Sequence, residues 1–207
     1  MEFETVDITA PNLLVVEGKD EELFFGKLIR HLGLGKIQIV AIGGKQNLRP
    51  NLKILVKSPQ FIDTVVSLGI VRDADDDPTA AFQSVRDTLK AVGLTVPENP
   101  LTPVGDNPQV SIMILPDARS SGMMESLCLR AVEKDHATLC VEQYFQCLQQ
   151  QGLLLPRNMS KAKVQVFLAS KPESGKRLGE AAEAGYWPWD DLAFEEVKNF
   201  LKQICFA

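Results

Sequence analysis

The sequence predicts an α/β protein with three layers, α/β/α, around a parallel four-stranded sheet, followed by a mostly helical C-terminal extension. Short apolar runs alternate with segments whose apolar residues recur at helical spacing. This alternation predicts right-handed βαβ units, and such units place helices on both faces of a parallel sheet. Helical spacing alone continues after the last apolar run, at residue 115, which predicts the helical extension.

The apolar runs and periodic segments give the expected elements in order. Strands are expected over residues 13–16, 37–42, 63–71 and 110–115. Helices are expected over residues 20–32, 45–57 (with an irregularity near Pro50), 80–92, 123–132, 139–150, 161–169 and 194–204. Asp77 and Pro78 open the third of these helices, because Asp caps helices and Pro suits the first turn. Residues 93–108 carry four prolines and predict a loop.

Length and composition place the chain among globular proteins. Its 207 residues are 45% hydrophobic and 24% charged, which fits an α/β core over residues 1–130 and a helical extension over 131–207 packed on it as one structural unit. No apolar stretch approaches the roughly 20 residues that span a bilayer, and no basic segment opens the chain. We therefore expect a cytoplasmic protein that makes no membrane contact. Four cysteines without a C-x-x-C pair and two histidines predict reduced thiols and no zinc site.

The negative charge of the chain is concentrated in three short motifs. The net charge is −5, and the motifs hold eight carboxylates; setting these aside leaves +3 for the rest of the chain. These carboxylates are Glu17, Asp20, Glu21, Asp73, Asp75, Asp76, Asp77 and Glu125. An acidic site on a mildly basic body suits a divalent metal ion with a phosphate ligand beside it.

Carboxylates follow two of the expected strands directly. Glu17 ends the first strand, and Asp73 and Asp75 end the third. Ligands of open parallel sheets bind at the carboxyl ends of the strands, so these side chains are expected at one edge. The bland alternative is that Asp residues in turns only cap helices, which suits Asp76 and Asp77 best. A calcium-binding EF-hand loop is excluded because its sixth and twelfth positions would be Pro78 and Ser84.

Three segments together resemble the Toprim domain, a Rossmann-like fold of topoisomerases, bacterial primases and some nucleases. They are Leu14–Glu21 (LVVEGKDE), Gly43–Lys45 (GGK) and Arg72–Asp75 (RDAD), and the resemblance covers roughly residues 10–130. That domain has a glutamate after its first strand and a D-x-D after its third. The resemblance implies that these carboxylates hold Mg²⁺ or Mn²⁺ for phosphoryl-transfer chemistry on nucleic acid.

Among Toprim proteins, the chain resembles a small standalone group of unknown function and, functionally, the domain of OLD-type nucleases. Glu21 matches an acidic residue one turn after the first glutamate, and Ser121–Glu125 resembles a later acidic motif, with Ser121 loosely spaced. Gly122-x-x-Glu125 and Gly179–Trp187 resemble the standalone group further. The resemblance implies metal ligation by Glu17, Glu21, Asp73, Asp75 and Glu125, and neutralisation of phosphate charge by Lys171; a solvated loop lysine is the alternative for Lys171.

Three further features have two interpretations each. The Gly43-Gly44-Lys45 segment offers backbone N–H groups and a cation to a phosphate at a helix N-terminus, or forms only a turn; it is not a P-loop. The Trp187-Pro188-Trp189 segment would stack single-stranded bases if exposed, or anchor a loop to the core. Asp20 either caps the first helix or belongs to the site.

Two functions compete at this point. The leading hypothesis is a nuclease or related phosphotransferase that uses two Mg²⁺ or Mn²⁺ ions to act on DNA or RNA. The competitor is a catalytically inactive module that binds metal or nucleic acid and works with a protein partner that supplies targeting. The sequence sets neither the oligomeric state nor the choice between DNA and RNA.

Overall fold

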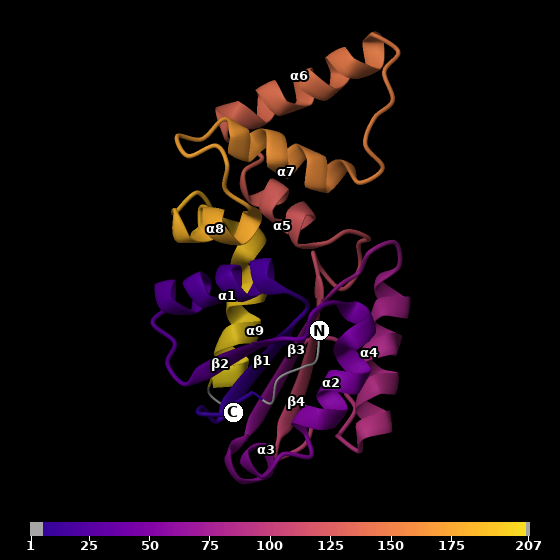
Figure 1. The fold of residues 1–207 in the computed structure, drawn as a ribbon, viewed down its shortest axis with the longest axis vertical. Coiled ribbons are helices and arrows are strands. Elements are labelled where there is room, and N and C mark those ends of the chain that lie inside the picture. Colours follow the sequence, from indigo (N-terminus) through magenta and orange to yellow (C-terminus); the bar gives the residue numbers. More distant parts are fainter. Residues whose placement is uncertain (1–5, 206–207) are drawn as a thin grey trace.

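The computed structural model describes residues 6–205 and has a four-stranded, all-parallel sheet with helices on both faces (Figure 1). Its strands are β1 (Asn12–Val16), β2 (Ile37–Ala41), β3 (Ser67–Asp73) and β4 (Gln109–Leu115), in the spatial order β2-β1-β3-β4. The predicted fold class, a three-layer α/β/α arrangement on a parallel sheet, is confirmed.

Nine α-helices and two short 3-10 helices, η1 and η2, lie within residues 6–205. The helices between the strands are α1 (Lys19–His31), η1 (Lys45–Asn47), α2 (Leu48–Leu55), α3 (Pro59–Thr64) and α4 (Pro78–Val92). Those after β4 are α5 (Met124–Ala131), α6 (His136–Gln150), α7 (Met159–Ala169), α8 (Leu178–Glu183), η2 (Leu192–Phe194) and α9 (Glu195–Cys205).

Successive residues of each strand enter different hydrophobic cores, because side chains alternate across a sheet. Leu14 and Val16 of β1 pack in a core with α1, α5 and α7 to α9. Leu13 and Val15 face the opposite core, with α2, α3 and α4. Burial on both faces explains why the strands are continuous apolar runs in the sequence.

The sheet grows outward from β1 in two opposite directions, with β2 added at one edge of β1 and β3 at the other. The chain passes from β1 outward to β2 through α1, then returns to pair β3 with the other edge of β1. The helices α1 and α2–α4 consequently lie on opposite faces (Figure 1). Such a switch point leaves a crevice at the carboxyl ends of the two strands, where ligands of doubly wound sheets bind.

Most expected elements are present, with changes at their ends. The helix expected over 45–57 opens as η1 and continues as α2, and Pro50 lies in the first turn of α2, where a missing N–H costs little. Asp77 caps α4 as predicted, accepting hydrogen bonds from the N–H groups of Thr79 and Ala80 at 2.9 and 3.0 Å. α1 begins at Lys19 after Gly18, so Asp20 lies inside the helix and does not cap it.

The prediction of a strand over 63–71 was wrong in its first residues. Asp63 and Thr64 end helix α3, and β3 begins only at Ser67. Ser58 caps α3 by accepting a hydrogen bond from the Phe61 N–H at 3.1 Å, and Pro59 follows at the first helical position. This Ser-Pro pair is a helix-start signal that outweighs the apolar run behind it. Helix α8 was not predicted, because its short Gly- and Ala-rich sequence shows no clear apolar stripe.

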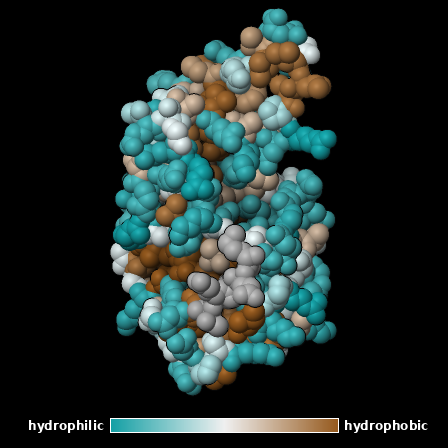
Figure 2. Space-filling view, viewed as in Figure 1, coloured by the Kyte–Doolittle hydropathy of each residue, from teal (hydrophilic) through white to brown (hydrophobic). Residues whose placement is uncertain are grey.

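The chain after α5 first leaves the sheet and then returns to it. Helices α6 and α7 form a hairpin that projects beyond the end of the sheet, while α9 packs on β1, β3 and β4 (Figure 1). Gly69 in β3 makes this return possible, because a Cβ there would lie 2.2 Å from Ile204 Cδ1. Apolar side chains are exposed at the end of the projection, where Leu153 to Leu155 join its two helices (Figure 2).

Two aromatic residues near α8 belong to the core. Trp187 and Trp189 are 2% and 7% exposed, and the Trp187 ring stacks on Phe167. The indole N–H of Trp187 donates to the carbonyl of Leu178 at 3.1 Å. The Trp-Pro-Trp segment therefore anchors a loop, and neither ring is exposed to stack on a base. No helix within residues 6–205 has the length and apolarity needed to cross a membrane.

Candidate functional site

The strand register brings the first two motifs together at the switch point. β1 pairs with β3 up to Val15 opposite Ile70. Continuing this parallel register by two residues places Glu17 opposite Arg72, beside Asp73 at the end of β3. Glu17 and Asp73 thus lie at neighbouring strand ends, as the sequence predicts.

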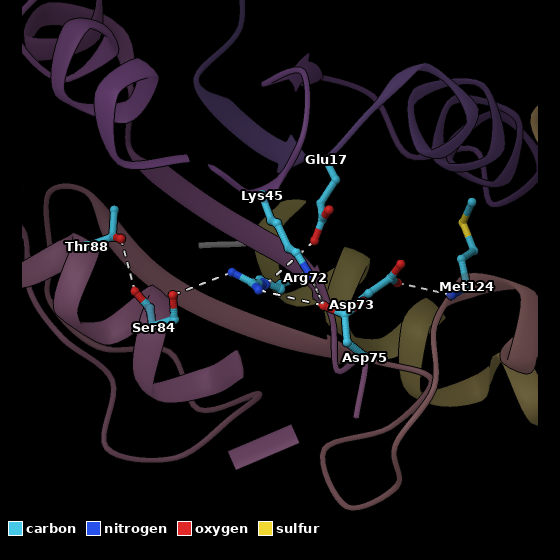
Figure 3. Close-up of polar contacts among 8 residues, drawn as sticks. All are labelled: Glu17, Lys45, Arg72, Asp73, Asp75, Ser84, Thr88 and Met124. Carbon is cyan, nitrogen blue, oxygen red and sulfur yellow. Dashed lines mark hydrogen bonds and ion pairs between the residues drawn. The ribbon is translucent and has the colours of Figure 1, made fainter. Parts of the chain in front are cut away.

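The third motif is tied to the second by backbone hydrogen bonds. The Gly122 N–H donates to the carbonyl of Asp75 at 2.7 Å, and the Met124 N–H donates to Asp73 Oδ1 at 3.0 Å (Figure 3). Gly122 has φ of 133°, and a Cβ there would lie 2.7 Å from Ser126 Oγ, so the turn requires glycine. These contacts hold Glu125, in the first turn of α5, beside the ends of β1 and β3. Ser121 remains exposed on the turn.

Four side chains form what we call the carboxylate cluster: Glu17, Glu21, Asp73 and Glu125. Loss of hydration raises the pKa of Asp73 well above its usual value, and the negative charges of the other three members raise it further. Burial likewise raises the pKa of Glu21, with added repulsion from Glu17 and Glu125. For Glu17, burial raises the pKa and the neighbouring Arg72 partly offsets this. Crowded, partly dehydrated carboxylates of this kind repel one another and favour a bound cation.

Asp75 lies apart from Asp73 and faces a basic partner. Its backbone has φ of 52°, a left-handed conformation that ends the pleat and turns its side chain away from the cluster (Figure 3). Lys45 Nζ lies 2.7 Å from Asp75 Oδ2, and Arg72 Nη2 lies 3.9 Å from the same oxygen. The hydrogen bond to Asp75 raises the pKa of Lys45. The two aspartates of the D-x-D motif therefore belong to different halves of the site: Asp73 to the carboxylate cluster, and Asp75 to an ion-paired half with Lys45 and Arg72.

Arg72 lies between these halves, and sequence reasoning gave it no role. Its side chain is 12% exposed, its Nε lies 3.6 Å from Glu17 Oε1, and its Nη1 donates to Ser84 Oγ at 3.5 Å (Figure 3). Arg72 Nε and Glu17 Oε1 are both buried without a hydrogen-bond partner. The available signal was an arginine directly after an apolar strand and directly before Asp73.

The glycine turn after β2 is built into the site's backbone. Gly43 and Gly44 have φ of 73° and 106°, and the Gly44 N–H donates to the carbonyl of Glu17 at 2.7 Å. This N–H therefore donates within the fold and is not one of the free N–H groups that the phosphate-binding interpretation requires. Lys45 of the same segment points at Asp75 (Figure 3).

Lys171 lies among other partners. Its Nζ is 2.8 Å from Asp135 Oδ2, at the start of α6, and 4.1 Å from the centroid of the Phe167 ring. The contacts found in residues 6–205 do not join it to the carboxylate cluster.

Basic side chains line cavities on two sides of the site. A cavity of about 490 Å³ contains Asp20 and Glu125 together with Lys161, Lys176 and Arg177. A second cavity, of about 500 Å³, lies between η1 and the start of α2 on one side and α4 on the other, and is lined by Lys45, Arg49 and Ser84, among others. Cationic and hydroxyl groups of this kind bind phosphate oxygens.

No group of three or more His, Cys, Asp or Glu side chains within residues 6–205 stands in a geometry that could hold a metal ion. Asp73 accepts the Met124 N–H, and Asp75 accepts a hydrogen bond from Lys45. The donor set nevertheless suits a hard cation, because it is all carboxylate.

A family model described as "Protein of unknown function (DUF3226)" matches residues 11–206. The chain belongs to the DUF3226 family. The matched segment of this DUF3226 protein includes the carboxylate cluster, Arg72 and both basic cavities. The chain matches no curated protein sequence.

Solved structures of the C-terminal region of the Xanthomonas campestris pv. campestris OLD protein are similar to the DUF3226 chain. One, phased with platinum, has a TM-score of 0.51 at 12% identity and covers 95% of both chains. Another, phased with mercury, has a TM-score of 0.48 at 15% identity, covering 95% of this chain and 97% of that one. At 12% identity, the platinum-phased structure shows that the two chains share a fold.

Proposed function

We propose that this DUF3226 protein is a divalent-metal-dependent nuclease, or a related phosphotransferase of Toprim type, that acts on DNA or RNA. The observation that carries the proposal is the carboxylate cluster at the switch point of the sheet. Four acidic side chains from the end of β1, α1, β3 and α5 converge there; desolvation raises the pKa of Asp73, Glu21 and Glu17, and repulsion within the cluster raises that of Asp73 and Glu21 further. The fold shared with the OLD protein region and the order of the three motifs support the same function.

The cluster members are the proposed ligands of Mg²⁺ or Mn²⁺, whereas Asp75, which the sequence also predicts as a ligand, is paired with Lys45. A bound divalent cation would activate a water molecule and stabilise charge on the leaving oxygen. The chain's own contribution is positional: the hydrogen bond from Met124 fixes Asp73, and the turn at Gly122 fixes Glu125. The bound cation would also neutralise the cluster and so relieve the repulsion among its carboxylates at neutral pH.

Phosphates of the nucleic acid are assigned to the two basic cavities. Lys161, Lys176 and Arg177 lie in the cavity that contains Glu125, so they are better placed than Lys171 to neutralise phosphate charge there. Lys45 and Arg49 serve the cavity on the other side of Arg72. A net-acidic chain with two basic cavities would bind polyanions locally, and the affinity would fall steeply with salt.

The test is cleavage of plasmid DNA, single-stranded DNA and single-stranded RNA with Mg²⁺ or Mn²⁺. Wild type should cleave at least one of them, and Glu17→Gln and Asp73→Asn should lower the rate at least about 100-fold. Asp76→Asn is the matched control, because Asp76 is exposed and outside the cluster, and its rate should stay near that of the wild type. Equal rates in all four proteins would show that a contaminating nuclease is measured.

One observation favours the second candidate, a metal- or nucleic-acid-binding module without catalysis. Arg72 and Lys45 already pair with Glu17 and Asp75, so part of the acidic charge is neutralised within the chain. The module would bind labelled oligonucleotides with a Kd that Lys161→Glu and Lys176→Glu raise, yet leave them intact in every metal. Cleavage by the wild type that Asp73→Asn abolishes excludes this candidate.

A further inference from the structure

The geometry points to Arg72 as a fixed substitute for a second metal ion, so that the site takes one divalent cation per chain where a two-metal site would take two. This inference rests on the proposed metal-dependent function and specifies how the site is charged. It differs from the two-ion expectation drawn from the sequence.

The guanidinium of Arg72 lies between two carboxylates, Glu17 and Asp75. Its Nε lies 3.6 Å from Glu17 Oε1, at the end of β1, and its Nη2 lies 3.9 Å from Asp75 Oδ2, beyond β3 (Figure 3). The side chain is only 12% exposed, and its Nη1 is held by Ser84 of α4. It is therefore a positioned internal charge.

Positive charge is divided unequally between the two halves of the site. Asp75 faces both Arg72 and Lys45, so a divalent cation at Asp75 would meet two positive charges at close range. The rest of the cluster (Glu21, Asp73 and Glu125) has no ion pair among residues 6–205. One cation is thus favoured on the cluster side and opposed on the Asp75 side.

Two unpaired polar atoms mark the boundary between the halves. Arg72 Nε and Glu17 Oε1 are buried, face each other and lack partners, although buried polar atoms are normally paired. A small closing movement would join them and leave the second oxygen of Glu17 for a metal in the cluster. Arginine keeps its charge at every physiological pH, so Arg72 supplies a permanent cation where a second metal would be exchangeable.

The test counts Mn²⁺ ions on the intact, metal-stripped protein without reference to activity. Isothermal titration gives the stoichiometry, and electron paramagnetic resonance shows whether two Mn²⁺ ions are spin-coupled, as ions about 3.5–4 Å apart are. We expect wild type and Arg72→Lys to bind one Mn²⁺ with an uncoupled spectrum. Arg72→Gln should bind two, with a coupled spectrum, because it removes the permanent, largely buried one of the two charges that oppose the second ion; exposed Lys45 can move away from Asp75. Arg86→Gln on α4, which contacts Phe82 and Gln83, is the control and should match wild type.

The outcomes separate this inference from the function on which it rests. Two coupled Mn²⁺ ions on the wild type would overturn the role of Arg72 and leave the metal-dependent function standing. No bound Mn²⁺ would overturn both. A folded Arg72→Gln protein that still binds a single ion would also refute the proposal that Arg72 replaces a second metal ion. If that variant does not fold, the number of Mn²⁺ ions on the wild type decides the question.

Discussion

Asp73→Asn should stabilise the protein in metal-free buffer, although it removes a side chain of the proposed site. An asparagine at this position keeps the oxygen that accepts the Met124 N–H at 3.0 Å, so no hydrogen bond is lost. What disappears is a negative charge that is poorly hydrated and faces Glu17, Glu21 and Glu125. Relieving the desolvation of one such group is worth about 1–3 kcal/mol. For a chain of this size that corresponds to a rise in Tm of about 2–12 °C.

The dependence of this gain on pH has a definite sign. Because the pKa of Asp73 is raised in the folded state, the native protein holds a proton that the unfolded chain has already lost. Wild-type stability therefore falls as the pH rises from the unfolded pKa, about 3.9, through the raised native pKa. The advantage of Asp73→Asn should be largest at pH 8 and should shrink toward pH 5. Divalent metal should reverse the order, since a ligand at 100 times its Kd stabilises the wild type by about 2.7 kcal/mol.

Thermal unfolding in EDTA and in Mn²⁺ at pH 5, 6.5 and 8 measures these differences. The exposed Asp76→Asn should change the free energy of unfolding by less than about 0.5 kcal/mol under every condition. An Asp73→Asn protein that is more than about 1 kcal/mol less stable than wild type in EDTA at pH 8 would refute the reasoning. Asp73 would then be a structural group whose charge the fold needs.

Three further substitutions test the packing and pairing of the C-terminal helices. Gly179→Ala should cost about 1–3 kcal/mol in urea denaturation, because its Cβ would lie 2.5 Å from a backbone oxygen of α1; an unchanged midpoint would contradict this close contact. Lys171→Met should cost about 0.5 kcal/mol at pH 7, allowing for solvent screening of the pair. Its hydrogen bond lowers the pKa of Asp135, so this cost should begin to shrink at about pH 4 and vanish as the pH falls through the lowered pKa; a 100-fold loss of cleavage would instead place Lys171 in catalysis. Trp187→Ala should cost about 3–5 kcal/mol and lower the Tm, and a smaller loss than about 1 kcal/mol would mean the ring is not a core anchor.

How far the sequence predicts the site depends on which contacts are local. Glu17 directly follows β1 and Asp73 ends β3, so the alternation of strands and helices suffices to place them at one edge. Asp75 could not be placed the same way, because its left-handed backbone depends on a long-range hydrogen bond to Gly122. The role of Arg72 depends on partners from β1 and α4, which no local pattern reveals.

The same distinction holds for the fold. The cap formed by Asp77 is a local signal and was predicted correctly. The start of β3 was misplaced because an apolar run over 63–71 has the same composition whether it is strand or helix end, and only the Ser58 cap separates the two. Helix α8 forms because Gly179 lets it approach α1 closely, which is a tertiary cause and not a propensity.

The position of α9 has a consequence for how the protein is made. One face of the central strands is covered by Val197, Phe200, Leu201 and Ile204, which the ribosome delivers long after β4. The strands and α2 to α4 can assemble earlier, but the opposite face then exposes apolar side chains until α9 emerges. During that interval the nascent sheet is open to aggregation and is a natural client for chaperones. Slowing synthesis between residues 116 and 195 should therefore lower the yield of folded protein more than slowing it before β4.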